Sequence, residues 1–121
     1  MIARKSGTVI NVSSIAGFKA FPSHAAYCAS KFAVHGLTET VRQETAKHGL
    51  RHILISPGVC STELLSHTSS DDIKDGYEAW KKEMGAPLVP KDVAGVILFA
   101  YQQPQHVCLR EIVVGPTFQD Q

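Results

Sequence analysis

Three residues have the types and the spacing of a site that moves protons. Tyr27 and Lys31 stand four positions apart, and Ser14 precedes Tyr27 by thirteen residues. A free tyrosine hydroxyl titrates near about pH 10, so its use at neutral pH needs roughly 4 kcal/mol of selective stabilisation of the anion. A lysine ammonium at ~4 Å supplies about 1 kcal/mol in water, but about 4 kcal/mol at an effective dielectric constant of ~20. In a sheltered pocket, these residues could run proton and hydride chemistry on a carbonyl group.

Each of these features also has an ordinary explanation. Tyr and Lys at this spacing are neighbours on any helix surface, and the serine pair that ends at Ser14 could consist of turn residues that hydrogen-bond the backbone. The order of the features along the chain is more informative. A strand-like run is followed by the serines, by a loop that contains Gly17 and Pro22, and by a helix that presents Tyr27 and Lys31 on one face. This order favours a site.

At this point the sequence resembles the short-chain dehydrogenase/reductase family, whose serine and Tyr-x-x-x-Lys pattern is matched by Ser14, Tyr27 and Lys31. A second segment agrees, because residues 57–62 follow the next strand-like run and look like the family's Pro-Gly segment, which holds the nicotinamide carboxamide. Cys60 departs from the family pattern, in which this position is usually aliphatic. If main-chain groups make the contact, this change costs little.

The resemblance implies an NAD(P)-dependent enzyme that transfers hydride reversibly between the nicotinamide and a small hydroxy acid, alcohol or carbonyl compound. Tyr27 would act as general acid or base, Ser14 would hold the reacting oxygen, and Lys31 would stabilise the Tyr27 anion and hydrogen-bond the nicotinamide ribose. The implied catalytic residues are therefore Ser14, Tyr27 and Lys31. The implied cofactor-binding residues are Tyr27, Lys31, Pro57, Gly58, Val59, Cys60 and Thr62.

The hydrophobic pattern predicts an α/β chain with strands at 8–13, 51–56 and 111–114 in a parallel sheet. Parallel strands would bring Ser14 and the Pro57-Gly58 pair to the same carboxyl edge, where open α/β sheets bind ligands. By resemblance, this sheet is the C-terminal half of a Rossmann-like doubly wound parallel sheet. Residues 1–121 would then be a partial NAD(P)-binding domain that holds the catalytic half.

Two helices are predicted to cover this sheet. The first runs from about Ser23 to His48 and ends at Gly49. The other begins at Pro90 and ends before Pro104. The residues predicted to form the apolar side of the first helix are Ala26, Ala29, Ala33, Leu37 and Val41, and those of the second are Val93, Val96, Ile97 and Ala100.

A further amphipathic helix is predicted within residues 70–85. Acidic residues lie at its start and lysines at its end, as the helix dipole favours. Its apolar stripe consists of Ile73, Tyr77, Trp80 and Met84. The stripe could simply pack on the body of the protein. By resemblance to the family, this helix would instead be a lid over the pocket, with Tyr77 and Trp80 in contact with the substrate.

The family's N-terminal half has no counterpart in this sequence. No glycine-rich fingerprint follows a first strand, and no acidic or basic residue is placed to contact the ribose 2′ position. Met1 therefore looks like a fragment boundary or an internal start codon, and the chain alone is expected to show no saturable NADP(H) binding. The alternative function is an inactive fragment that serves as an interaction or oligomerisation module, since family members usually form dimers or tetramers. In its full-length form the protein is expected to be a homo-oligomer.

Composition excludes several other classes of function. Twelve basic and eleven acidic residues give a net charge of +1, which implies no attraction to nucleic acid or to a membrane surface. No signal peptide or membrane span is recognised, so the predicted location is the cytoplasm. Three separated cysteines match neither a zinc site nor a disulfide framework, and we expect no metal. Residues 103–117 are similar to a subgroup that oxidises 3-hydroxy acids such as serine, usually with NADP, so NADP is favoured over NAD.

Overall fold

The structure is a computed structural model that describes residues 1–63, 67 and 69–119. Three parallel strands form one sheet in the order β1 (Gly7–Val12), β2 (Leu50–Pro57) and β3 (Glu111–Val114). In the register of the sheet, Val9 pairs with His52 and Pro57 pairs with Val114. The predicted strands and their parallel arrangement are confirmed. Because all three strands run in the same direction, their carboxyl ends meet at one edge.

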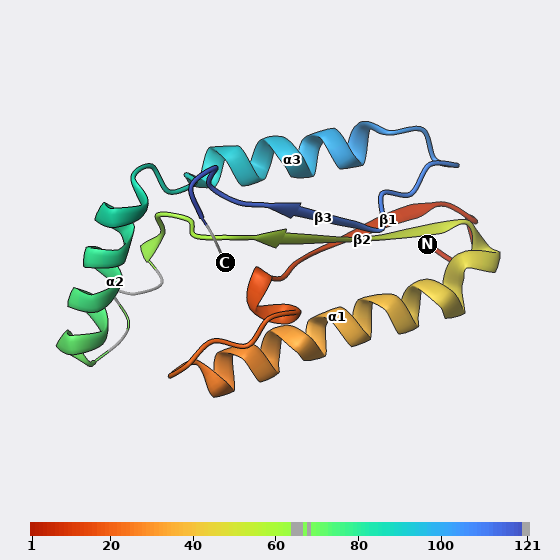
Figure 1. Ribbon diagram of the computed structural model, residues 1–121. Coiled ribbons are helices and arrows are strands. Elements are labelled where there is room, and N and C mark those ends of the chain that lie inside the picture. Colours follow the sequence, from red (N-terminus) through yellow and green to blue (C-terminus); the bar gives the residue numbers. More distant parts are fainter. Residues whose placement is uncertain (64–66, 68, 120–121) are drawn as a thin grey trace.

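Helices lie on both faces of this sheet, as Figure 1 shows. Helix α1 (Ala25–Thr45) covers one face and α3 (Pro90–Gln102) covers the other, while α2 (Asp71–Met84) stands beyond the carboxyl ends of the strands. Short 3₁₀ turns follow β1 and α1, at η1 (Ile15–Gly17) and η2 (Ala46–His48). None of the helices in the described ranges is long and apolar enough to span a bilayer.

The apolar core lies between β2 and α3. Ile53, Ile55 and Ala100 are fully buried and pack together. The predicted apolar side of α3 is confirmed, because Val93, Val96 and Ile97 surround this cluster. Alternation along β2 sends Ile53 and Ile55 to the same side of the sheet, which explains why one helix can cover both.

Arg51 holds the end of α3. Its buried guanidinium donates hydrogen bonds to the carbonyl oxygens of Tyr101, Gln103 and Val107 at 3.0, 2.7 and 3.2 Å. The last carbonyl groups of a helix have no partner within the helix, and a cation at this end also complements the helix dipole. The buried charge of Arg51 is thus satisfied by the C-terminal end of α3.

Helix α1 begins at Ala25, two residues later than the predicted Ser23. Ser23 adopts a left-handed conformation with a φ of 62°, which is incompatible with the first turn of an α-helix. The α-helix ends at Thr45, and the 3₁₀ turn η2 continues the helical path to His48, so the predicted stop at Gly49 is confirmed for the end of η2. Gly49 has a φ of 71°, and a Cβ atom at this position would lie 2.7 Å from the carbonyl oxygen of Lys5. Only glycine therefore fits the end of η2 without strain.

The predicted apolar side of α1 is wrong. Its members do not face the sheet, because Ala26, Ala29, Ala33 and Leu37 are exposed and Val41 is only half-buried. Cys28 and Thr38 are the buried residues of this helix instead. The physical reason lies in the sheet, where Asn11 donates a hydrogen bond to the Thr38 hydroxyl at 2.8 Å and His52 lies 3.0 Å from the Thr45 hydroxyl. Polar partners, rather than alanines, are therefore turned inward.

Helix α2 forms within the predicted range, with Asp71 and Asp72 in its first turn and lysines in its last turn. Tyr77 and Trp80 are half-buried, and their ring centroids lie 5.5 Å apart. Ile73 is 44% exposed, and the side chain of Met84 lies outside the described part of the chain. The predicted stripe is therefore confirmed for its two aromatic members only.

Candidate active site

Ser14 is positioned by the end of β1. The amide of the preceding Ser13 donates to the carbonyl oxygen of Ile55 on β2 at 2.8 Å, which continues the sheet by one further bond. Ser14 is extended and caps η1, because its hydroxyl oxygen accepts a hydrogen bond from the amide of Ala16 at 3.1 Å. A serine hydroxyl has one hydrogen and two acceptor sites. The buried Ser14 hydroxyl accepts this bond through one of its two acceptor sites.

Tyr27 and Lys31 occupy the first two turns of α1. The Lys31 ammonium lies 5.7 Å from the centroid of the Tyr27 ring and donates to the carbonyl oxygen of Val12 at 3.4 Å. Tyr27 is 36% exposed. Lys31 therefore joins the tyrosine to the end of β1, the strand from which Ser14 follows. This arrangement places a cation beside the ring, but Tyr27 is exposed, so the described residues alone do not form the sheltered pocket that the chemistry of the pair requires.

The segment 57–60 continues β2 past the edge of the sheet. The Gly58 amide donates to the carbonyl oxygen of Val114 at 2.7 Å, and the Val59 amide donates to the side-chain oxygen of Gln119 at 3.1 Å. On the same side, the Leu88 amide donates to the Val59 carbonyl at 2.9 Å, and the Ser61 amide donates to the Leu88 carbonyl at 2.7 Å. The segment is thus held from β3, from the C-terminal tail and from the chain before α3.

Cys60 presents its main-chain groups in the opposite direction. It forms a parallel bridge with Leu88 in which the neighbouring residues make the hydrogen bonds. Because the backbone groups of an extended chain alternate in direction, the Cys60 amide and carbonyl point away from Leu88. They offer one donor and one acceptor side by side. The Thr62 side chain, also predicted to bind the cofactor, is exposed.

Helix α2 brings Tyr77 towards these groups. The pKa of Tyr77 is raised, first by burial and then by its closeness to Tyr27, Cys60 and Glu78. Burial also raises the pKa of the Cys60 thiol, and Asp92 adds to that shift. Both phenol and thiol are therefore neutral at physiological pH. Tyr77 is thus close enough to Tyr27 and Cys60 to interact with them electrostatically, although it comes from an element with few contacts to the sheet.

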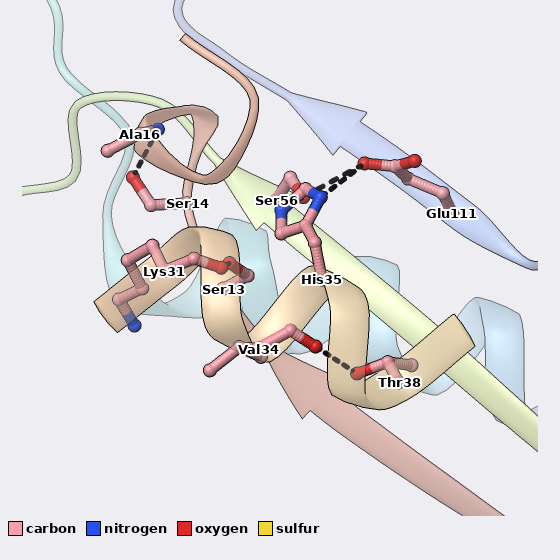
Figure 2. A network of polar contacts seen from close by, with 9 residues as sticks. All are labelled: Ser13, Ser14, Ala16, Lys31, Val34, His35, Thr38, Ser56 and Glu111. Carbon is pink, nitrogen blue, oxygen red and sulfur yellow. Dashed lines mark hydrogen bonds and ion pairs between the residues drawn. The ribbon is translucent and has the colours of Figure 1, made fainter. Parts of the chain in front are cut away.

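A polar network ties α1 to the strands beneath this edge, as Figure 2 shows. The fully buried Ser56 hydroxyl lies 3.4 Å from Nε2 of His35 and 3.3 Å from the Glu111 carboxylate. Nδ1 of His35 lies 3.7 Å from the same carboxylate. A Cβ atom on Gly17 would fall 2.2 Å from Nε2 of His35, so the imidazole also contacts η1 closely. His35 therefore links the helix that carries Tyr27 to η1, β2 and β3.

Sequence reasoning did not identify His35 or Gln119. His35 follows Lys31 by one helical turn, and this spacing is a signal that could have placed it beside the site. Gln119 has no such signal, because only the turn after β3 brings it back to Val59. The predicted residues themselves gather at the carboxyl edge of the sheet. Their groups are a hydroxyl donor, a phenol beside an ammonium, and a main-chain donor and acceptor pair.

Comparisons with known proteins agree with this arrangement. The family model for short chain dehydrogenases matches residues 1–73. An oxidoreductase of Listeria monocytogenes is 39% identical over 120 residues, which are 98% of this chain and 48% of the relative. A serine dehydrogenase complexed with NADP⁺ has a TM-score of 0.87 at 26% identity, with 100% of this chain and 48% of that chain covered. A 4-hydroxyisoleucine dehydrogenase complexed with NADH has a TM-score of 0.77 at 27% identity, with 97% and 49% covered. The chain thus spans about half the length of these relatives.

Proposed function

Because this chain belongs to the short-chain dehydrogenase/reductase family, we propose that it forms the catalytic half of an NAD(P)-dependent oxidoreductase. The observation that carries the proposal is the convergence of Ser14, the Tyr27–Lys31 pair and the Cys60 main chain at one edge of the sheet. The remaining length of the relatives, which this chain does not span, would bind the adenosine and pyrophosphate parts of the dinucleotide.

The residues present fit a nicotinamide group. A carboxamide has a carbonyl acceptor and an amide donor, and the Cys60 amide and carbonyl supply the complementary pair on one side of the segment. Pro57, Gly58 and Val59 would position this pair, and the Thr62 hydroxyl would add a further contact. Lys31 would also contact the nicotinamide ribose. When bound, the nicotinamide supplies or accepts the hydride.

The proposed chemistry of the chain itself concerns the proton. In the reductive direction, a carbonyl carbon gains the hydride while the oxygen takes the proton of the Tyr27 hydroxyl, so that C=O becomes CH–OH. Ser14 donates its hydrogen to the same oxygen and stabilises the negative charge that develops there. The Lys31 ammonium stabilises the Tyr27 anion that remains. Oxidation of an alcohol reverses each step.

The proposed substrate is a small hydroxy acid, alcohol or carbonyl compound. The named activities of the serine and 4-hydroxyisoleucine dehydrogenases support a hydroxy amino acid, and their complexes support either NADP or NAD as the cofactor. Tyr77 and Trp80 on α2 would form the apolar side of the pocket. Because α2 has few contacts with the sheet, it is suited to close as a lid and to exclude water from the reacting carbon.

To test the proposal, this chain would be fused to the portion of the Listeria monocytogenes relative that the chain does not span. We call this fusion the extended protein. Turnover would be measured with a panel of 3-hydroxy acids and both cofactors. We expect Tyr27→Phe to lower kcat by about 10²–10⁴-fold, because it removes the proton donor and keeps the ring. Leu98→Ala, on the exposed side of α3, is the matched control. A Tyr27→Phe variant with undiminished kcat would refute the proposal.

A second candidate function is association with another polypeptide. The exposed stripe of α1, formed by Ala26, Ala29, Ala33 and Leu37, favours it. The outer edge of β1 also pairs with no other strand in the described part of the chain, and open strand edges recruit other chains. Light scattering would test this function. Leu37→Glu should dissociate an oligomer that Lys47→Glu, outside the stripe, leaves intact. The partner could be a second copy, which would give the predicted homo-oligomer.

A further inference from the structure

The C-terminal tail turns back onto the segment that follows β2. After β3, the Gln119 amide donates to the carbonyl oxygen of Pro116 at 3.0 Å, which closes a turn. This turn places the Gln119 carboxamide against Val59, whose amide donates to the carboxamide oxygen at 3.1 Å. Gln119 is half-buried although it lies near the end of the chain. The tail therefore makes a specific polar contact with the proposed cofactor-binding segment.

Gly58 and Gln119 are complementary in shape. A Cβ atom on Gly58 would lie 2.1 Å from the side-chain oxygen of Gln119 and 3.2 Å from the Cα atom of Gly115. Any larger residue would expel the carboxamide from its position beside Val59. The absence of a side chain at Gly58 thus creates the space that Gln119 occupies.

Filling space does not explain why this residue is a glutamine. The Gln119 amide nitrogen is buried and has no hydrogen-bond partner among the described residues. A buried donor without a partner is unfavourable, and methionine would fill the same volume without that cost. The favourable contribution of the side chain is therefore the acceptor oxygen, because the Val59 amide needs a partner on this side.

We propose that Gln119 is a positioning residue that, together with Leu88, fixes the direction in which Cys60 presents its main-chain groups. The inference rests on the proposed function, in which those groups bind the nicotinamide carboxamide. Val59 is held on one side by Gln119 and Leu88, and the alternation of the backbone then turns the Cys60 amide and carbonyl to the other side. Leu88 holds the two peptides on either side of Cys60, and Gln119 holds the peptide before them. Without the Gln119 oxygen, the peptide between Gly58 and Val59 can rotate, and the chain enters the bridge with Leu88 without an anchor.

The first experiment measures steady-state kinetics in the extended protein. Gln119→Met removes the acceptor at similar volume, and Gln119→Glu retains an acceptor oxygen at the same position. We expect Gln119→Met to raise the KM for the dinucleotide about five- to tenfold, because one hydrogen bond is lost. The kcat and the KM for the hydroxy acid should stay within about twofold of the unmodified protein. Gln119→Glu should restore most of the dinucleotide KM. An unchanged dinucleotide KM in Gln119→Met, or an equal change in all constants, would overturn the positioning role.

The second experiment uses the 121-residue chain and needs no turnover. Amide hydrogen exchange measured by NMR should be faster at Val59 in Gln119→Met than in the unmodified chain. The Gly58 amide, which donates to Val114, is the internal control and should not change. Equal exchange at Val59 in both chains would refute the contact itself. If the proposed function is wrong, the unmodified extended protein will show no turnover. The exchange measurement on the 121-residue chain still tests the contact between Gln119 and Val59 in that case.

Discussion

The two sides of β2 are built from different kinds of side chain. Towards α3, Ile53 and Ile55 are fully buried among apolar residues. Towards α1, His52 and Ser56 are buried with polar partners, and only Leu54 between them is apolar. Apolar contacts have little directional preference, whereas hydrogen bonds require particular distances and angles. The side towards α3 therefore supplies stability, while the side towards α1 fixes the orientation of the helix that carries Tyr27 and Lys31.

The largest expected effect on stability lies on the apolar side. Ile55→Ala should lower the free energy of unfolding by roughly 2–5 kcal/mol, because it removes a fully buried side chain and leaves a cavity. Urea denaturation of the 121-residue chain would measure the change. Leu98→Ala, at a residue that is 54% exposed on α3, should stay within about 0.5 kcal/mol. If both variants lost the same free energy of unfolding, the apolar side of β2 would not be the main source of stability.

The close contact between Gly17 and His35 should show coupling on the polar side. Gly17→Ala places a methyl group 2.2 Å from Nε2 of His35 and should cost roughly 1–3 kcal/mol through overpacking. Most of this cost should disappear when the same change is made in a His35→Ala background. A double-mutant cycle of unfolding free energies measures the coupling. Additive effects of the two substitutions would contradict the observed contact.

A single hydrogen bond between α1 and β1 should have a smaller effect. Thr38→Val removes the hydroxyl that accepts from Asn11 and donates to the carbonyl oxygen of Val34. We expect a loss of about 1 kcal/mol, because the amide of Asn11 loses its acceptor. Thr38→Ser keeps the hydroxyl and should retain most of the stability. Thermal unfolding of the three chains would reveal the order, and a Thr38→Val chain as stable as the parent would refute it.

The smallest expected effect is a pH dependence of the unfolding free energy. It arises from His52, which is buried on the side of β2 that faces α1. Burial lowers the pKa of His52, and the nearby Arg42 adds to this shift. The unfolded chain therefore binds a proton at higher pH than the folded chain. The contribution of the neutral imidazole is complete above about pH 6.5 and is lost as the pH falls below it, with a slope of at most about 1.4 kcal/mol per pH unit. As the pH is lowered from 7 to 5, the free energy of unfolding should fall less steeply in His52→Gln than in the parent chain.

Much of the arrangement could be predicted from residue patterns. The three strands follow from their apolar runs, and the apolar side of α3 follows from the spacing of Val93, Val96 and Ile97. The gathering of Ser14 and the Pro57-Gly58 pair at one edge follows from parallel pairing. The strands and the apolar side of α3 depend on neighbours in sequence. The parallel direction of the strands follows from the alternation of strands and helices along the chain. The roles of Ser14, Tyr27, Lys31 and the segment 57–62, the lid, the oligomer and the cytoplasmic location stay predictions.

The orientation of α1 could not be predicted in the same way. Its alanines and Leu37 form the more regular apolar stripe, yet they are exposed, because Thr38 and His35 have partners on β1 and β2. Those partners are between 21 and 27 residues distant in sequence, and no local pattern identifies them.

Local sequence determined the elements of this protein, the direction of its strands and the order of its reactive residues. The tertiary structure alone decided which side of α1 is inward, where His35 lies, and that Gln119 returns to Val59 across 60 positions of the chain. The physical reason is that helices and strands depend on short-range periodicity, whereas a hydrogen bond between distant residues depends on the position of both backbones. Such contacts exist only once the sheet has formed.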